Sequence, residues 1–294
     1  MRCPSLTTLR DVFRLSFALF AATTITTAVL ASDLESPTGT FFSITESKSR
    51  FQSDGKTITV ERFEPIGVGK YPGILVIHGS GGMILGGLSF RESARNLAKR
   101  GYVAHVVHYF DLTGTTIADR STMEKHFASW MRTLAEAITN LENQPNVDPK
   151  RIGLVGFSLG GFLSVSLSVY DHRVLAVADY YGGLPDVLAK DVKTLPPLLI
   201  LHGDADMIVP VAEAKKLEAL CRKKNVVHEV KIYKGQGHGF LGEQGADASR
   251  QVVSFLDAYV KFSDTARPRR PTATIPSSEA IIKAEKSAAS SNGT

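Results

Sequence analysis

Ser158 stands in the sequence GFSLG at residues 156–160, with one glycine two positions before it and another two positions after it. A serine becomes a nucleophile when a sharp, strained turn between a strand and a helix lifts its hydroxyl above the sheet. Such a turn has no room for Cβ atoms at the two flanking positions, and Gly156 and Gly160 meet that requirement. The pattern also arises by chance, and the alternative interpretation is a glycine-rich turn with an incidental serine. A predicted strand before it and a predicted helix after it favour the nucleophile.

His238 is the candidate general base. It lies in the sequence GQGHGF at residues 235–240, directly after the last predicted strand. A histidine flanked by glycines in a loop is poorly explained as a packed core residue. It is well explained as an imidazole that a loop delivers to a serine hydroxyl, whose proton it would remove.

Two carboxylates compete for the role of the acid that orients this histidine. The sequence LHGDADMIVP at residues 201–210 ends a predicted strand and carries Asp204 and Asp206. One of them would hold the imidazole in the correct tautomer and stabilise its positive charge. The other would be a turn residue whose side chain bonds nearby backbone N–H groups. Because each candidate follows a strand, and parallel strands end at one edge of a sheet, we expect serine, acid and histidine to meet there.

A glycine-rich stretch, HGSGG at residues 78–82, follows the first buried strand and completes the candidate site. Its glycines let the backbone approach a substrate, so the N–H groups of Ser80 and Leu159 are the candidate oxyanion donors. The aromatic and apolar residues near the strand ends predict an apolar pocket for small or medium esters. The candidate pocket residues are Gly79, Gly81, Met83, Tyr109 and Tyr181.

No cofactor and no metal is predicted. A dinucleotide fingerprint starting at Gly79 would need glycine at position 84, where Ile84 stands, and no phosphate-binding loop motif occurs. His105 and His108 lie three positions apart in a predicted strand, hence on opposite faces. The chain has 2 cysteines, too few for a disulfide framework or a zinc site built from several thiolates.

The elements that must position these residues follow from the pattern of short apolar runs alternating with amphipathic stretches. With 294 residues, 43% of them hydrophobic and 21% charged, the chain is long enough for one large globular core. Alternating strands and helices predict a single α/β domain with a mostly parallel sheet of about seven or eight strands and helices on both faces. The expected strands are 57–63, 73–78, 103–109, 152–157, 174–180, 198–202 and 227–233, and the expected helices are 90–99, 122–141, 159–170, 211–223 and 248–262.

The two ends of the chain differ in composition from the body at residues 32–264. Residues 1–31 have a basic start, an apolar run and small residues at Val29 and Ala31, which predicts a signal peptide cleaved between Ala31 and Ser32 and a secreted or periplasmic protein. The alternative is an uncleaved membrane anchor. Residues 265–294 are rich in Pro, Ser, Ala and Thr and are expected to be a disordered tail. Most of the net charge of +5 belongs to these ends, which argues against a nucleic-acid-binding body. Once the signal peptide is cleaved, no membrane partner is expected.

Together, the motifs GFSLGG, HGDADMIVP, GQGHGF and HGSGG resemble the dienelactone hydrolase family of α/β-hydrolases. The resemblance extends over about Thr57 to Phe262. It implies the α/β-hydrolase fold without a large lid domain, Asp206 as the acid and His238 as the base. The enzymes that give the family its name use a cysteine nucleophile, whereas this chain has serine at position 158.

The expected function is a serine hydrolase that cleaves carboxylic esters or lactones, small-molecule substrates, through a Ser-His-Asp triad and an acyl-enzyme intermediate. One alternative is a serine peptidase acting on short peptides, which can use the same triad; a comparison of ester with amide turnover separates the two. Another is a non-catalytic binding protein of the same fold.

Overall fold

The computed structural model describes residues 41–263, 273–277 and 279–284. The predicted signal peptide at residues 1–31 and its cleavage point lie outside these residues. A single eight-stranded sheet crosses the molecule in the order β1-β2-β4-β3-β5-β6-β7-β8. The strands are β1 (Ile44–Ser53), β2 (Lys56–Pro65), β3 (Tyr71–Ile77), β4 (Val103–Val107), β5 (Val147–Phe157), β6 (Val174–Tyr180), β7 (Leu198–Gly203) and β8 (His228–Tyr233).

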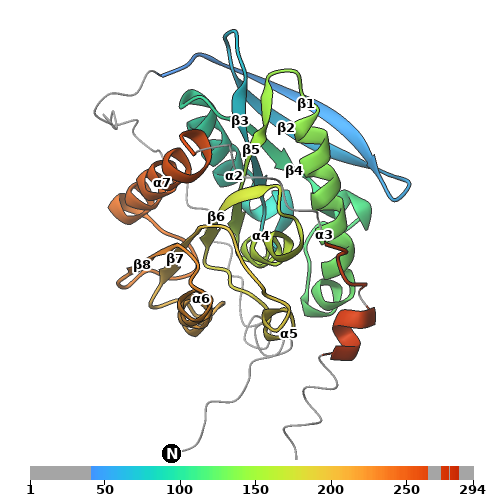
Figure 1. Cartoon of the computed structure of the whole chain (residues 1–294), viewed down its shortest axis with the longest axis vertical. Coiled ribbons are helices and arrows are strands. Elements are labelled where there is room, and N and C mark those ends of the chain that lie inside the picture. The colour runs from blue at the N-terminus through green and yellow to red at the C-terminus, as the bar shows by residue number, and fades with distance from the viewer. Residues whose placement is uncertain (1–40, 264–272, 278, 285–294) are drawn as a thin grey trace, which may run out of the picture.

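The sheet is mostly parallel, as the sequence predicts. Strands β4, β3, β5, β6, β7 and β8 pair in parallel, whereas β1 pairs with β2 and β2 with β4 in antiparallel fashion. Ile74, Leu75, Val76 and Ile77 of β3 are fully buried, which is the burial expected of a strand covered on both faces. The strand β1 was not predicted because its sequence, ITESKSRFQS, is mainly polar; it forms an edge strand through its pairing with β2 (Figure 1).

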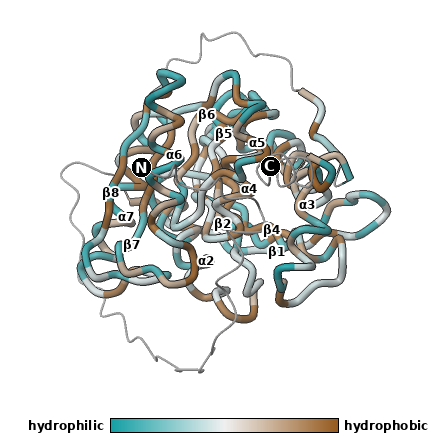
Figure 2. Tube along the Cα trace, turned by 90° about the horizontal axis from the view of Figure 1, so that it is seen from below, coloured by the Kyte–Doolittle hydropathy of each residue, from teal (hydrophilic) through white to brown (hydrophobic). Residues whose placement is uncertain are grey.

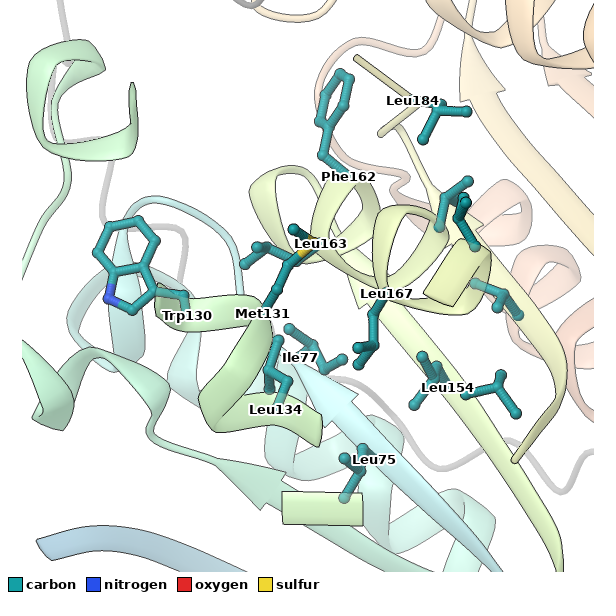
Figure 3. Close-up of a cluster of buried hydrophobic side chains, with 14 of the residues drawn as sticks. Leu75, Ile77, Trp130, Met131, Leu134, Leu154, Phe162, Leu163, Leu167 and Leu184 are labelled. Carbon is teal, nitrogen blue, oxygen red and sulfur yellow. The ribbon is translucent and has the colours of Figure 1, made fainter. Parts of the chain in front are cut away.

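Helices cover both faces of the sheet (Figure 1). Side chains of α3 (Arg120–Glu142), α4 (Leu159–Tyr170) and α6 (Ala212–Lys223) join one hydrophobic cluster, and those of α2 (Gly82–Lys99) and α7 (Gly242–Leu256) join the other. In the first cluster, Met131 of α3 and Leu163 of α4 lie with side chains of β3 and β5 (Figure 3). Hydrophobic stretches gather on the central elements, and hydrophilic stretches lie on the outer loops (Figure 2).

Short helical segments also occur within residues 41–263: η1 (Tyr109–Leu112), α5 (Asp186–Ala189) and the π-helical η2 (Asp257–Lys261). Helix α2 begins at Gly82, well before the start expected at residue 90. The sequence pattern does not indicate this earlier start, because glycines interrupt the apolar periodicity of the first turns. Among residues 41–263, 273–277 and 279–284, no helix combines the length and the hydropathy needed to cross a bilayer.

Part of the C-terminal segment packs on the body, which differs from the disordered tail expected for residues 265–294. The N–H of Ala273 donates to the carbonyl of Tyr170 at 2.8 Å, and Ile281 is only 4% exposed within the cluster around α3 and α4. Residues 279–284 form a helical turn, drawn in red in Figure 1. The average composition of residues 265–294 does not predict this contact, because only isolated isoleucines, Ile281 and Ile275, make it.

His78 closes β3 and is buried under the rings of the following elements. Its ring stacks on Tyr109 with the centroids 4.1 Å apart, and Phe110 meets its edge at 4.7 Å. The Tyr109 hydroxyl donates to the His78 carbonyl at 2.9 Å, while the His78 Nδ1 lies 2.9 Å from the Gly79 carbonyl oxygen. Burial lowers the pKa of His78 from 6.5 to about 3, against the opposing effect of its hydrogen bond to Gly79. The imidazole is therefore neutral at pH 7.

Replacing His78 by Phe should change how stability depends on pH. The folded-state pKa of His78 lies below the unfolded value of 6.5, so the unfolded chain takes up a proton as the pH falls below about 6.5 and the folded chain does not. This group therefore costs stability at a rate of up to about 1.4 kcal/mol per pH unit in that window. Relative to the wild type, we expect the free energy of unfolding of His78→Phe to improve from pH 7 to pH 4.5 in urea titrations. A constant difference across that range would contradict the buried neutral imidazole.

The packing of the C-terminal segment predicts a difference between two neighbouring isoleucines. Ile281 is buried, whereas Ile282 is partly exposed on the same helical turn. Ile281→Ala should lower the free energy of unfolding by about 2 kcal/mol, because it removes buried methyl groups and leaves a void. The matched control Ile282→Ala should cost less than half as much. Equal costs in denaturant titrations would show that the segment does not pack as described.

Candidate active site

The turn at Ser158 has the strained geometry that a nucleophile requires. Ser158 adopts φ 55° and ψ −118° between the end of β5 and the first residue of α4, and its N–H donates to the Tyr180 carbonyl at 2.9 Å. A Cβ at position 156 would collide with the Gly160 carbonyl, and one at position 160 with the Ile77 carbonyl. The absence of side chains at these two positions is therefore a steric necessity of the turn.

Ser158, His238 and Asp206 form one hydrogen-bonded chain. The distance from Ser158 Oγ to His238 Nε2 is 2.8 Å, and the distance from His238 Nδ1 to Asp206 Oδ2 is 2.7 Å. An ionised carboxylate only accepts hydrogen bonds, so Nδ1–H donates to Asp206 and leaves the Nε2 lone pair to accept the serine proton. The three residues come from positions far apart in the sequence, at the ends of β5, β7 and β8.

Asp206 is held in its ionised form. Burial raises the pKa of its carboxyl, but the hydrogen bond and charge of His238 and the backbone N–H groups of Ile208 and Val209 outweigh that effect, and the pKa is lowered below its ordinary value. The two N–H groups donate to Oδ1 at 2.8 Å and 2.9 Å, which leaves Oδ2 for His238. The side chain of Asp206 is completely shielded from solvent.

Asp204, the competing carboxylate, has a different task. Its Oδ1 accepts the N–H of Gly235 at 2.6 Å, so it joins the turn after β7 to the turn after β8. The two turns also approach closely at Gly203, where a Cβ would collide with the Gln236 carbonyl. Asp204 therefore fixes the base of the loop that carries His238, and only Asp206 reaches the imidazole.

The stretch at residues 78–82 lies against the nucleophile turn. A Cβ on Gly79 would lie 3.2 Å from the Ser158 Cβ, and the Ser80 carbonyl accepts the N–H of Ala118 at 2.8 Å. Leu159 opens α4, so its N–H has no acceptor within the helix. The stretch at residues 78–82 and the first turn of α4 thus place backbone next to the Ser158 side chain.

The predicted pocket residues divide into two groups. Tyr181 is partly exposed and its ring centroid lies 4.6 Å from that of His238, and Gly81 and Met83 are also partly exposed. Gly79 is buried against the nucleophile. Tyr109 was wrongly assigned to the pocket: it is 0% exposed because the chain turns into η1 after β4 instead of continuing as a strand, which directs this ring onto His78.

Asp179 is a buried acid that sequence reasoning missed. It lies in β6 one residue before Tyr180, and Cβ atoms on Gly161 or Gly182 would collide with its Oδ1. Burial raises the pKa of its carboxyl well above the ordinary value. The signal that could have identified it is a single acidic residue within the otherwise apolar run VLAVADY.

A metal site and a reactive thiol would each place requirements on the described residues. Over the described ranges, no group of three or more His, Cys, Asp or Glu residues could hold a metal ion. Cys221 is buried in α6, and burial raises the pKa of its thiol to about 12, so it is not a thiolate at neutral pH.

Solved structures with the same fold include hydrolases of more than one specificity. A dienelactone hydrolase-like promiscuous phosphotriesterase from metagenomic libraries superposes with a TM-score of 0.65 at 20% identity, covering 73% of this chain and 98% of that one. The acylaminoacyl peptidase of Pyrococcus horikoshii superposes with a TM-score of 0.63 at 17% identity, covering 76% of this chain and 43% of that one. At these identities the likeness establishes the fold alone.

Several sequence relatives are named as carboxymethylenebutenolidases or their homologues. A Synechocystis sp. protein provisionally given that name is 28% identical over 218 residues, which cover 67% of this chain and 86% of the relative. A human carboxymethylenebutenolidase homologue is 25% identical over 181 residues, covering 57% of this chain and 70% of its own length. The dienelactone hydrolase family matches residues 58–265, most of the described body. The chain therefore belongs to the dienelactone hydrolase family, has the α/β-hydrolase fold and is a hydrolase of ester or lactone bonds.

Proposed function

We propose that this protein is a serine hydrolase that cleaves carboxylic esters or lactones through Ser158, His238 and Asp206. The observation that carries the proposal is the unbroken chain of hydrogen bonds, 2.8 Å from Ser158 Oγ to His238 Nε2 and 2.7 Å from His238 Nδ1 to Asp206 Oδ2. This is the relation of nucleophile, base and orienting acid that recurs in acyl-transfer enzymes of unrelated sequence. Serine takes the place of the cysteine that the resemblance to this family implies.

The reaction begins when His238 Nε2 removes the Ser158 proton and Oγ attacks the carbonyl carbon of the ester. A tetrahedral intermediate forms, and its negative oxygen lies between the N–H groups of Leu159 and Ser80, which we assign as the oxyanion donors. The imidazolium then gives its proton to the departing alcohol, which leaves an acyl group on Ser158. Water, deprotonated by the same imidazole, attacks the acyl carbon and releases the acid.

Asp206 acts through the imidazole. Because it stays ionised and shielded from solvent, it fixes Nδ1–H as the donor and stabilises the imidazolium at the moment the serine proton moves. The ring of Tyr181 packs beside the imidazole, with the two centroids 4.6 Å apart.

Two rival functions use the same fold. A serine peptidase acting on short peptides would share the triad, and the acylaminoacyl peptidase of P. horikoshii has a similar fold. Family membership favours esters and lactones over amides. A non-catalytic binding protein would have no need of the strained serine or of the aligned imidazole, which argues for catalysis.

We also propose that the protein is exported and that residues 1–31 are removed by cleavage after Ala31. The support is the order of a basic start, an apolar run and small residues before the cleavage point. A site that needs no reduced thiol is compatible with an oxidising compartment.

Substitutions at Ser158, Asp206 and Asp204 test the triad. Ser158→Ala should lower kcat/KM for p-nitrophenyl acetate by at least about 10³-fold, since it removes the attacking atom. Asp206→Asn should lower it by about 10²-fold or more, because an amide neither fixes the tautomer nor stabilises the imidazolium. The matched control Asp204→Asn keeps an oxygen for the Gly235 N–H and should stay within about threefold of the wild type.

The rates are measured on variants whose thermal unfolding matches the wild type. If Ser158→Ala retains full activity, or if Asp204→Asn loses more activity than Asp206→Asn, the assignment is wrong.

A further inference from the structure

The first turns of α2 expose a row of large apolar side chains. Ile84, Leu85 and Leu88 are 66%, 53% and 81% exposed. Positions 84 and 88, and positions 85 and 88, are spaced so that they share one face of a helix. This helix begins at Gly82, at the end of the stretch that lies against Ser158. The exposed row therefore starts at the candidate oxyanion loop.

Three more exposed apolar side chains stand on the other loops that form the site. Met207 is 80% exposed and directly follows Asp206, and Leu241 is 60% exposed in the loop that carries His238. Ile117 is 49% exposed and precedes Ala118, whose N–H donates to the Ser80 carbonyl. We call these six side chains the apolar rim: Ile84, Leu85, Leu88, Ile117, Met207 and Leu241.

The short segments that carry the apolar rim contain no charged side chains. Residues 83–88, 113–118, 207–211 and 237–241 contain no Lys, Arg, Asp or Glu. Single exposed apolar residues are ordinary on protein surfaces, but a group of them around one site marks a place where an apolar ligand is bound. A charged substrate group would find no ionic partner in these segments. A hydrocarbon chain that lies against them would bury apolar surface that is otherwise exposed to water, which favours its binding.

We propose that the site acts on neutral esters with an extended apolar acyl group, about six carbons or longer, that lies against the apolar rim while its carbonyl reaches Ser158. This inference rests on the proposed ester hydrolysis and adds the substrate class. The exposed face of α2 is the principal contact, because three of the six rim residues belong to it and it leads directly away from the oxyanion loop.

A series of p-nitrophenyl esters from acetate to octanoate, each below its critical micelle concentration, tests this substrate class. Each methylene that leaves water for the rim should raise kcat/KM about two- to fourfold. p-Nitrophenyl esters of dicarboxylic acids, with a terminal carboxylate and the same chain length, should be hydrolysed at least about tenfold less efficiently, because that charge has no partner on the rim.

Two substitutions assign this preference to the rim. Leu88→Gln and Met207→Gln should each lower the ratio of kcat/KM for octanoate to kcat/KM for acetate at least about threefold, because they replace apolar contacts by an amide. Both positions are exposed, so the fold should tolerate them. The matched control is Val68→Gln, an exposed apolar residue in the turn between β2 and β3, which should leave the ratio unchanged.

The outcomes separate this inference from the proposed function. If the wild type hydrolyses acetate but gains nothing with chain length, or if the rim variants keep the wild-type ratio, the substrate class is wrong and the serine hydrolase stands. The longer esters are then also assayed above the critical micelle concentration; a rate that rises only there would overturn the proposal in favour of a lipid surface as the partner. If no ester is hydrolysed faster by the wild type than by Ser158→Ala, the proposed function itself fails.

Discussion

The close approach of bare backbone at Ser158 is the constraint on which the site depends. The turn places α4 against the end of β3, and the contact at Gly160 is with the carbonyl oxygen of Ile77. Any side chain at positions 156 or 160 would force these elements apart. The serine itself must then accept a positive φ, a conformation that costs a residue with a Cβ about 1 kcal/mol or more and persists only where surrounding packing enforces it. Here the enforcing structure is β3, buried from Pro72 to Ile77, and the completely buried α4.

At the same edge of the sheet, the hydrogen-bond partners of each buried ionisable side chain determine whether it is charged. His238 and Asp206 lie at the ends of neighbouring parallel strands, and their turns are joined by the Asp204 side chain and by the close contact at Gly203. Asp206 is buried but remains ionised because two backbone N–H groups and the imidazole satisfy it. His78, by contrast, has only a carbonyl oxygen near its Nδ1 and aromatic rings around it, and it is neutral. Two buried ionisable groups, one after β3 and one after β7, thus differ in charge because their partners differ.

Glycine spacing indicated the candidate site in the sequence, and the structure brings Ser158, His238 and Asp206 within hydrogen-bond distance of one another. Ser158 and His238 could be recognised because only glycines permit the turns that carry them. Spacing alone could not decide whether Asp204 or Asp206 orients the histidine, since both carboxylates occupy the same turn. The resemblance to a family favoured Asp206, and the distance of 2.7 Å from Asp206 Oδ2 to His238 Nδ1 agrees with that choice. Tyr109 was misplaced because the short apolar run of β4 does not show where the strand gives way to η1. The burial of Ile281 could not be predicted either, because it depends on packing against residues far away in the sequence and not on the local sequence pattern.

The proposed function requires that the fold activate the hydroxyl of Ser158. Treating the full chain and its Ser158→Ala variant with a fluorophosphonate probe, and reading the intact mass of each, tests this directly and requires no knowledge of the substrate. Activation by His238 predicts a single covalent adduct on the wild-type protein and none on the variant. A folded wild-type protein without an adduct, or an adduct that persists in Ser158→Ala, would contradict the account.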